Sequence, residues 1–199
     1  MAPQASALAN PAPLGLMGFG MTTVLLNLHN AGFVPMGSAI LGMGLMFGGG
    51  AQIIAGILEY QKGNTFGMTA FIAYGAFWLS LVALIALPRF GVGDASSPSL
   101  MGSYLLIWGL FTFIMFLGTL RATKVHQTIF ASLTVLFGLL AFGDLLGQPL
   151  LTVIAGYEGI FCGLSAIYLA AAEVLEAQFH THVLPVGPYV AYPPQALPA

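Results

Sequence analysis

Long apolar segments without any charged side chain dominate this sequence and restrict what it can fold into. The first such segment runs from Leu14 to Phe33 and contains no Asp, Glu, Lys or Arg. One helix needs about 20 apolar residues to cross a bilayer. Over the whole chain 58% of residues are hydrophobic and 5% are charged, whereas soluble domains carry roughly 25% charged residues. The sequence therefore predicts an integral membrane protein with the lipid bilayer as its solvent.

Short breaks rich in Gly, Pro and polar residues divide the apolar sequence into six predicted membrane-spanning helices. A membrane β-barrel would instead show segments of roughly 10 residues with alternating polarity. We therefore expect an all-α fold, a six-helix bundle in which successive helices are antiparallel neighbours. The expected spans are 13–33, 36–59, 66–87, 100–120, 125–146 and 150–175. They form a transmembrane domain over 13–176, between a short N-terminal segment, 1–12, and a Pro-rich tail, 177–199.

The few basic residues predict the orientation of the bundle. Lys62, Arg121 and Lys124 fall in loops that share one side with both termini, and Arg89 falls on the other side. The positive-inside rule then places both termini in the cytoplasm, with the protein in the inner (plasma) membrane of the cell. Only four Lys and Arg occur in the chain, so no basic surface for nucleic acid is expected.

Several motifs in the same order resemble the acetate uptake transporter family, the succinate-acetate permease group. The most specific is the heptapeptide NPAPLGL, and further similar blocks continue from Ala9 to Pro185. The resemblance implies a transporter or anion channel for acetate, and for succinate or other short carboxylates. It also implies a homo-hexameric ring in which each protomer has its own pathway. The heptapeptide consists of Asn10, Pro11, Ala12, Pro13, Leu14, Gly15 and Leu16, and Asn10 is expected to cap the first helix.

The resemblance further implies an apolar constriction made by Phe19, Tyr74 and Leu133. These residues lie in the first, third and fifth spans, which all start on the cytoplasmic side. At about 1.5 Å per residue they lie at one level, roughly 9 to 14 Å into the bundle. A narrow apolar ring can gate a pathway by excluding water. Depth alone favours ordinary core packing, since every span has some apolar residue at that level, and it is the resemblance that favours a constriction.

A carboxylate that crosses this bundle needs hydrogen-bond donors, and no predicted span contains a Lys or Arg. Hydroxyl and amide side chains are the remaining donors. A hydroxyl in a helix commonly bonds its own backbone, while an amide in mid-span is costly without a partner, so Gln52 is the strongest candidate. The predicted substrate-binding residues are Thr22, Asn27, Gln52, Thr69 and Ser165.

Two acidic residues of the last span are candidate proton carriers. Glu158 lies eight residues beyond Leu150, so either it is an intramembrane carboxyl or the helix begins later. Glu173 lies near the cytoplasmic end of the same span. Glu59 precedes Lys62 by three residues, a spacing typical of a weak local ion pair.

The motif Gly-apolar-hydroxyl-Ala-apolar occurs at 67–71 and again at 163–167. These segments lie in the third and sixth spans, which run in opposite directions, so a three-plus-three inverted repeat is one interpretation. The alternative is chance, because small residues recur in membrane helices.

No catalytic motif or phosphate-binding loop is present, so we expect no enzyme activity and no cofactor. The single cysteine, Cys162, excludes a multi-cysteine metal site, and no metal site is expected. A channel for a small neutral solute such as urea is the alternative function. A structural membrane protein is the alternative from another class.

Overall fold

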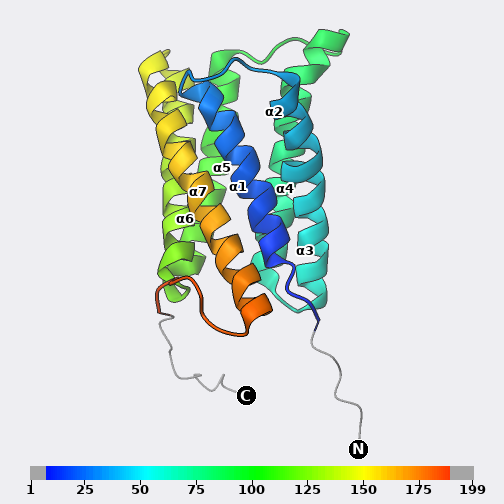
Figure 1. The fold of residues 1–199 in the computed structure, drawn as a ribbon. Helices are drawn as coiled ribbons and strands as arrows, with labels where there is room; N and C mark the ends of the chain where they lie inside the picture. The colour runs from blue at the N-terminus through cyan, green and yellow to red at the C-terminus, as the bar shows by residue number, and fades with distance from the viewer. Residues whose placement is uncertain (1–7, 189–199) are drawn as a thin grey trace, which may run out of the picture.

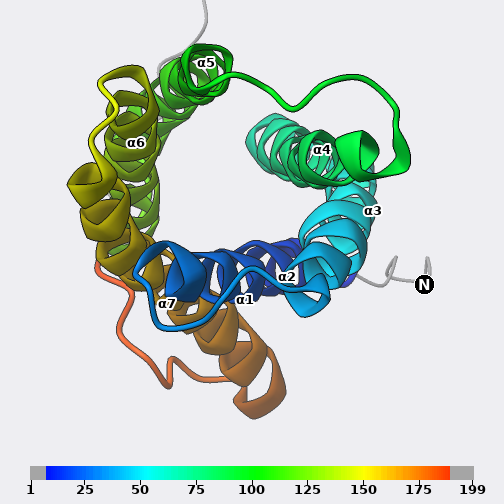
Figure 2. The same ribbon diagram turned by 90° about the horizontal axis from the view of Figure 1, so that it is seen from above.

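The computed structural model describes residues 8–188, and these residues form an all-helical bundle. Figure 1 shows helices running up and down between two ends, and Figure 2 shows that they surround the bundle axis in chain order. The helices are α1 (Ala12–Asn30), α2 (Ser38–Met43), α3 (Gln52–Gln61), α4 (Thr65–Ala86), α5 (Pro98–Gly118), α6 (Lys124–Leu145) and α7 (Pro149–Phe179).

A π-helical segment, Gly44–Ala51, joins α2 to α3, so that Ser38–Gln61 is one long helix. Short 3-10 turns extend α4 over Leu87–Phe90 and α5 over Thr119–Arg121. Each of the six predicted spans therefore corresponds to one helical segment. π-helical turns are rare and occur frequently at functional sites, and the sequence analysis did not predict this one.

Five of the six segments in the described part of the chain are long and apolar enough to cross a membrane. The sixth, α1, has 19 residues and buries Thr22, Thr23 and Asn27. These polar side chains lower its hydropathy. Asn27 lies against Gly159 of α7, and Thr22 lies against Gly48 of the π-helical segment. The chain is thus a multi-pass membrane protein, and α1, which begins within the heptapeptide, is the least apolar of its six helical segments.

Close backbone contact between α1 and α7 depends on glycine. A Cβ atom on Gly20 would lie 2.7 Å from the carbonyl oxygen of Gly163, and a Cβ on Gly163 would lie 2.7 Å from that of Gly20. No larger residue fits at either position without moving a backbone, which is how small residues bring membrane helices together. The contact fixes the rotation of α1 relative to α7.

The prediction that Asn10 caps α1 is wrong. Pro11 occupies the N-cap position, although the Asn10 side chain accepts a 3.3 Å hydrogen bond from the Ala12 N–H. Proline tolerates this place because the first turn of a helix needs no N–H donor. The Asn10 side chain also makes contacts far along the chain, which are described below.

Candidate functional site: a closed row of internal cavities

Three small cavities follow one another inside the bundle, and each shares lining residues with the next. The first, at the end where α1, α4 and α6 begin, has a volume of 70 Å³, and the second and third have 20 Å³ and 30 Å³. The first and second share Leu16, Ala70, Phe71 and Phe130. One water molecule needs roughly 10–15 Å³. The second and third cavities therefore have room for a water or two, and a larger solute would fit only if side chains moved.

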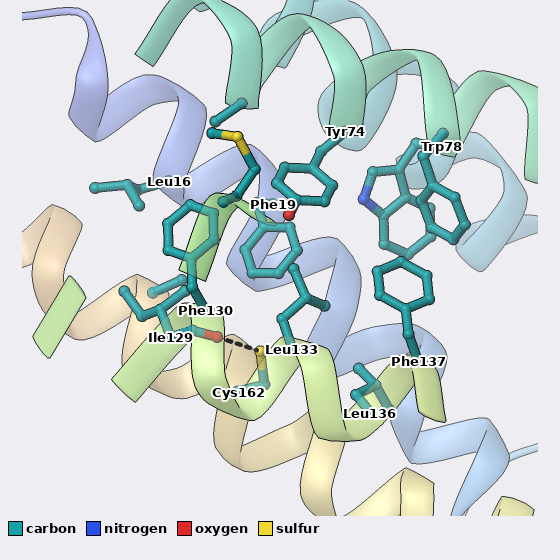
Figure 3. Packing of buried hydrophobic residues seen from close by; sticks show 14 of the residues in the cluster. Leu16, Phe19, Tyr74, Trp78, Ile129, Phe130, Leu133, Leu136, Phe137 and Cys162 are labelled. Atoms are coloured by element: carbon teal, nitrogen blue, oxygen red, sulfur yellow. Dashed lines mark hydrogen bonds between the residues drawn. The ribbon is translucent and has the colours of Figure 1, made fainter. Parts of the chain in front are cut away.

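Phe19, Tyr74 and Leu133 line both the second and the third cavity. They come from α1, α4 and α6, and Figure 3 shows their side chains pointing toward one another. Their exposed fractions are 7%, 4% and 3%, and the rings of Phe19 and Tyr74 have centroids 5.9 Å apart. The structure thus brings the three predicted constriction residues together, at the point where the row of cavities is interrupted.

The Tyr74 hydroxyl is directed to a neighbouring helix. It donates a 3.1 Å hydrogen bond to Thr112 Oγ1 of α5, and Thr112 in turn donates to the carbonyl of Trp108 at 2.8 Å. This hydroxyl is engaged in a buried bond between α4 and α5. Tyr74 therefore lines the cavities with its aromatic ring, while its hydroxyl is bound to α5.

Gln52 places an unpaired amide beside the second cavity. Its side chain is fully buried, and neither Nε2 nor Oε1 has a hydrogen-bond partner among the described residues. A buried unpaired polar group costs about 1–3 kcal/mol. Gln52 is the first residue after the π-helical segment. The amide can supply hydrogen bonds to a solute or a water in the cavity.

Polar residues also border the third cavity. Asn27 lines it, but its amide nitrogen donates to the Thr23 carbonyl at 2.9 Å and its oxygen accepts from Asn30 at 3.0 Å. Trp78 lines the same cavity, and its indole Nε1–H has no hydrogen-bond partner within residues 8–188. Sequence reasoning missed Trp78, although a tryptophan deep inside a span, away from the membrane interface, is itself a signal.

The other predicted substrate-binding residues are placed differently. Thr22 is fully buried with an unpaired hydroxyl, but it is not among the residues that line these three cavities. Thr69 is half-buried and is also not among them. Ser165 is half-buried in a groove on the outer side of α6 and α7, where it donates to the Phe161 carbonyl at 2.9 Å. Ser165 is therefore not brought together with the constriction.

Glu158 lies in the middle part of α7, because this helix begins at Pro149 and not later. It accepts a hydrogen bond from Ser132 of α6, and its second oxygen has no partner. Glu158 is half-buried and does not line the three cavities. The carboxyl lies beside the row of cavities and not in it.

Comparisons with known proteins identify relatives that match most of the chain. The model of the GPR1/FUN34/yaaH family matches residues 1–189. The succinate-acetate/proton symporter SatP of Escherichia coli is 58% identical over 180 residues, which are 90% of this chain and 96% of that protein. Acetate permease A of Emericella nidulans is 32% identical, over 92% of this chain and 67% of that protein.

A solved structure has the same fold. It is described as the structure of the bacterial acetate channel SatP, and it superposes with a TM-score of 0.90 at 57% identity. The match covers 91% of this chain and 100% of the solved one. The six-helix architecture is therefore shared over nearly the whole chain.

Proposed function

Because the chain belongs to the GPR1/FUN34/YaaH family, we propose that it carries acetate, and succinate or other short carboxylates, across the membrane. The observation that supports this function best is the row of three cavities with the unpaired Gln52 amide beside it. Relatives that share most of this chain's length are a succinate-acetate/proton symporter and an acetate permease. The pathway lies inside each protomer, along the axis seen in Figure 2.

The ring of Phe19, Tyr74 and Leu133 is the gate in this proposal. The ring closes the pathway, because the cavities on its two sides have volumes of only 20 Å³ and 30 Å³. An apolar ring of this kind resists an ion until water or the solute itself enters. Opening requires that at least one of the three side chains changes rotamer or that its helix shifts.

Gln52 on one side of the gate and Trp78 on the other offer N–H donors to the carboxylate. Both are neutral, and the basic residues of the chain, Lys62, Arg89, Lys124 and Arg121, lie at helix ends. Neutral donors hold an anion less tightly than a buried cation does. Weak binding suits conduction, because the solute must also leave. Thr22, Asn27 and Thr69 have weaker support as ligands, and Ser165 has the least.

Labelled acetate should enter liposomes that contain the protein faster than it enters protein-free liposomes, whereas labelled urea should not. An apolar gate with an amide N–H donor on one side and an indole N–H donor on the other suits a solute with two acceptor oxygens. The measurement is the initial uptake of each solute at pH 7. Equal stimulation of urea and acetate would support the neutral-solute channel, which nothing in the structure favours, and no stimulation of either would leave a structural role.

The protein further forms a hexameric ring in this proposal, with both termini in the cytoplasm of a bacterial-type inner membrane. The start of α1 and the end of α7 lie at one end of the bundle (Figure 1), as this orientation requires. Gly42 of α2 is exposed, and no atom lies within 4 Å of a Cβ built on it, which leaves room for another helix. The three-plus-three inverted repeat is kept as part of the same proposal.

The mass of the protein in mild detergent should therefore be that of six chains. Multi-angle light scattering, corrected for bound detergent, measures it directly. A monomeric mass in a preparation that still transports acetate after reconstitution would contradict the ring.

A further inference from the structure

A short segment after α7 folds back and reaches the start of α6. Figure 1 shows it in red, between the end of α7 and the first turn of α6. The Pro185 carbonyl accepts a 2.9 Å hydrogen bond from the Tyr168 hydroxyl of α7, and the Val186 carbonyl accepts a 3.2 Å hydrogen bond from the Val125 N–H of α6. Residues 185–187, which we call the strap, therefore join the two helices.

Gly187 fits the last residue of the strap closely against the start of α6. Its φ of +80° is in the left-handed region that favours glycine. A Cβ built on it would lie 2.7 Å from Cβ and 2.8 Å from Cγ of Lys124, and 3.2 Å from the Lys124 backbone nitrogen. Lys124 is the first residue of α6. A larger residue at 187 would therefore push the strap away from α6.

The strap spans one end of the groove on the outer side of α6 and α7. This groove has a volume of 340 Å³, and its lining includes Val125 and Tyr168, the two residues that bind the strap. The rest of the lining consists of Thr128 of α6 and of Phe161, Leu164 and Ser165 of α7. The two helices thus leave space between them on this side, and the strap connects the two edges of that space.

Close backbone contacts hold α6 near its other end, far from the strap. A Cβ on Gly102 of α5 would lie 2.9 Å from the Ala141 carbonyl oxygen of α6. A Cβ on Gly143 of α6 would lie 3.4 Å from the Thr152 nitrogen of α7. The part of α6 that precedes Gly138 contains no glycine, so no residue of this part offers another helix the same close approach. The start of α6 is therefore the part that is free to pivot.

The other helix beside the groove, α7, is held to α1 at the same end of the bundle. Glu173 Oε2 of α7 accepts a 2.8 Å hydrogen bond from the Asn10 amide nitrogen, and the Asn10 oxygen accepts from Lys62 Nζ at 2.8 Å. The contact of Gly163 with Gly20 joins the same two helices by their backbones. Of the two helices that border the groove, α7 is thus fixed and α6 is the one that can move.

The half of α6 beside the strap carries two residues of the pathway. Phe130 lines the first and second cavities, and Leu133 lines the second and third. We propose that the strap is an autoinhibitory brace, which holds α6 in the closed arrangement and whose release lets the start of α6 swing into the groove, so that Phe130 and Leu133 withdraw from the pathway. This inference rests on the proposed transport function and adds the element that regulates its gate.

Gly187→Ala tests the strap in liposomes that contain the full chain. The added methyl meets Lys124, and alanine disfavours the positive φ, so the strap should detach. Initial uptake of labelled acetate per folded molecule should rise about threefold, the shift in a two-state equilibrium that loss of one net hydrogen bond produces. Tyr168→Phe deletes the hydrogen bond to Pro185 and should change uptake in the same direction.

Gly93→Ala and Tyr157→Phe are the matched controls. Gly93 also has a positive φ, +73°, but it lies in the loop between α4 and α5, and no atom is found within 4 Å of a Cβ built on it. Tyr157 is an exposed tyrosine of α7 that does not line the groove. Both controls should transport at the wild-type rate. If Gly187→Ala and Tyr168→Phe leave uptake per folded molecule unchanged or lower it, the strap only supports the fold and the inference is overturned.

A cross-link across the groove tests the movement of α6 directly. Thr128→Cys combined with Leu164→Cys places one thiol on each side of the groove, while the native Cys162 is fully buried and protected from reagents. A short, reducible reagent that joins two thiols should lower acetate uptake toward background, and reduction should restore it; each single-cysteine variant, treated alike, is the control. Cross-linked protein that transports at its unlinked rate overturns the inference. A wild-type protein without any acetate uptake contradicts the transport function itself.

Discussion

Leu133→Ala should raise the ratio of lactate uptake to acetate uptake by about tenfold, the effect of one or two methylenes in a fitted apolar site. Leu133 lies between the second and third cavities and is 3% exposed. Truncation widens the closed ring without removing a hydrogen-bond donor that acetate uses. The bulkier solute therefore gains more than the smaller one. The measurement is the uptake ratio in cells or liposomes, normalised to the amount of membrane-inserted protein.

The alternative for Leu133 is plain core packing, and a matched variant tests it. Leu169→Ala removes the same atoms from a site in α7 that is 1% exposed and is not among the lining residues of the three cavities. Each truncation opens a void that costs about 2–5 kcal/mol. If both variants lower protein amount and leave the ratio unchanged, Leu133 is a core residue and not part of the gate.

Tyr74→Phe extends the comparison to hydrogen bonding. It keeps the aromatic ring and deletes the hydroxyl that binds Thr112 of α5. Because that hydroxyl is already engaged, acetate uptake should stay close to that of the wild type and the lactate ratio should not change. A large loss of acetate uptake at normal protein level would instead show that the hydroxyl leaves Thr112 to bind the solute.

The helical segments could be predicted from the sequence because the bilayer fixes the length of an apolar run and charged or Pro-rich breaks mark its ends. The common level of the three candidate constriction residues could be predicted for a related reason. Helices that start at one surface rise by the same amount per residue, so Phe19, Tyr74 and Leu133 reach one level. Depth alone did not separate a gate from a core, and it was the family resemblance that singled out these three residues.

Rotation of each helix about its axis was not predictable. A helix that is apolar all round has no polar face that indicates which side is turned toward the bundle axis. Ser165 was therefore expected near the solute, and instead it faces outward from α7. The π-helical segment Gly44–Ala51, which precedes Gln52, has no sequence signature comparable to a cap. The Asn10 to Glu173 bond joins residues 163 positions apart, and only the closed ring of helices brings them together.

Gly163→Ala should strongly reduce the stability of the bundle. The added methyl would lie 2.7 Å from the Gly20 carbonyl oxygen and 2.7 Å from a methyl of Val24, and 3.0 Å from the Val24 backbone nitrogen. Two of these atoms belong to the backbone of α1, so no side-chain rotation relieves the contact. Overpacking of this kind costs about 1–3 kcal/mol or more. The thermal midpoint of the purified protein in detergent should fall by several degrees.

Gly138→Ala is the control, because Gly138 lies within α6 and no atom is found within 4 Å of a Cβ built there. Alanine is favoured over glycine inside a helix by roughly 0.5–1 kcal/mol, so this variant should melt at or above the wild-type temperature. Opposite shifts for the same chemical change would show that backbone contact, and not helix propensity, makes Gly163 necessary. Because Phe19 and the last five residues of the heptapeptide lie on α1, Gly163→Ala should also lower acetate uptake per folded molecule, whereas Gly138→Ala should not. Equal midpoints for the two variants would contradict the close approach of α1 and α7 on which the position of the gate depends.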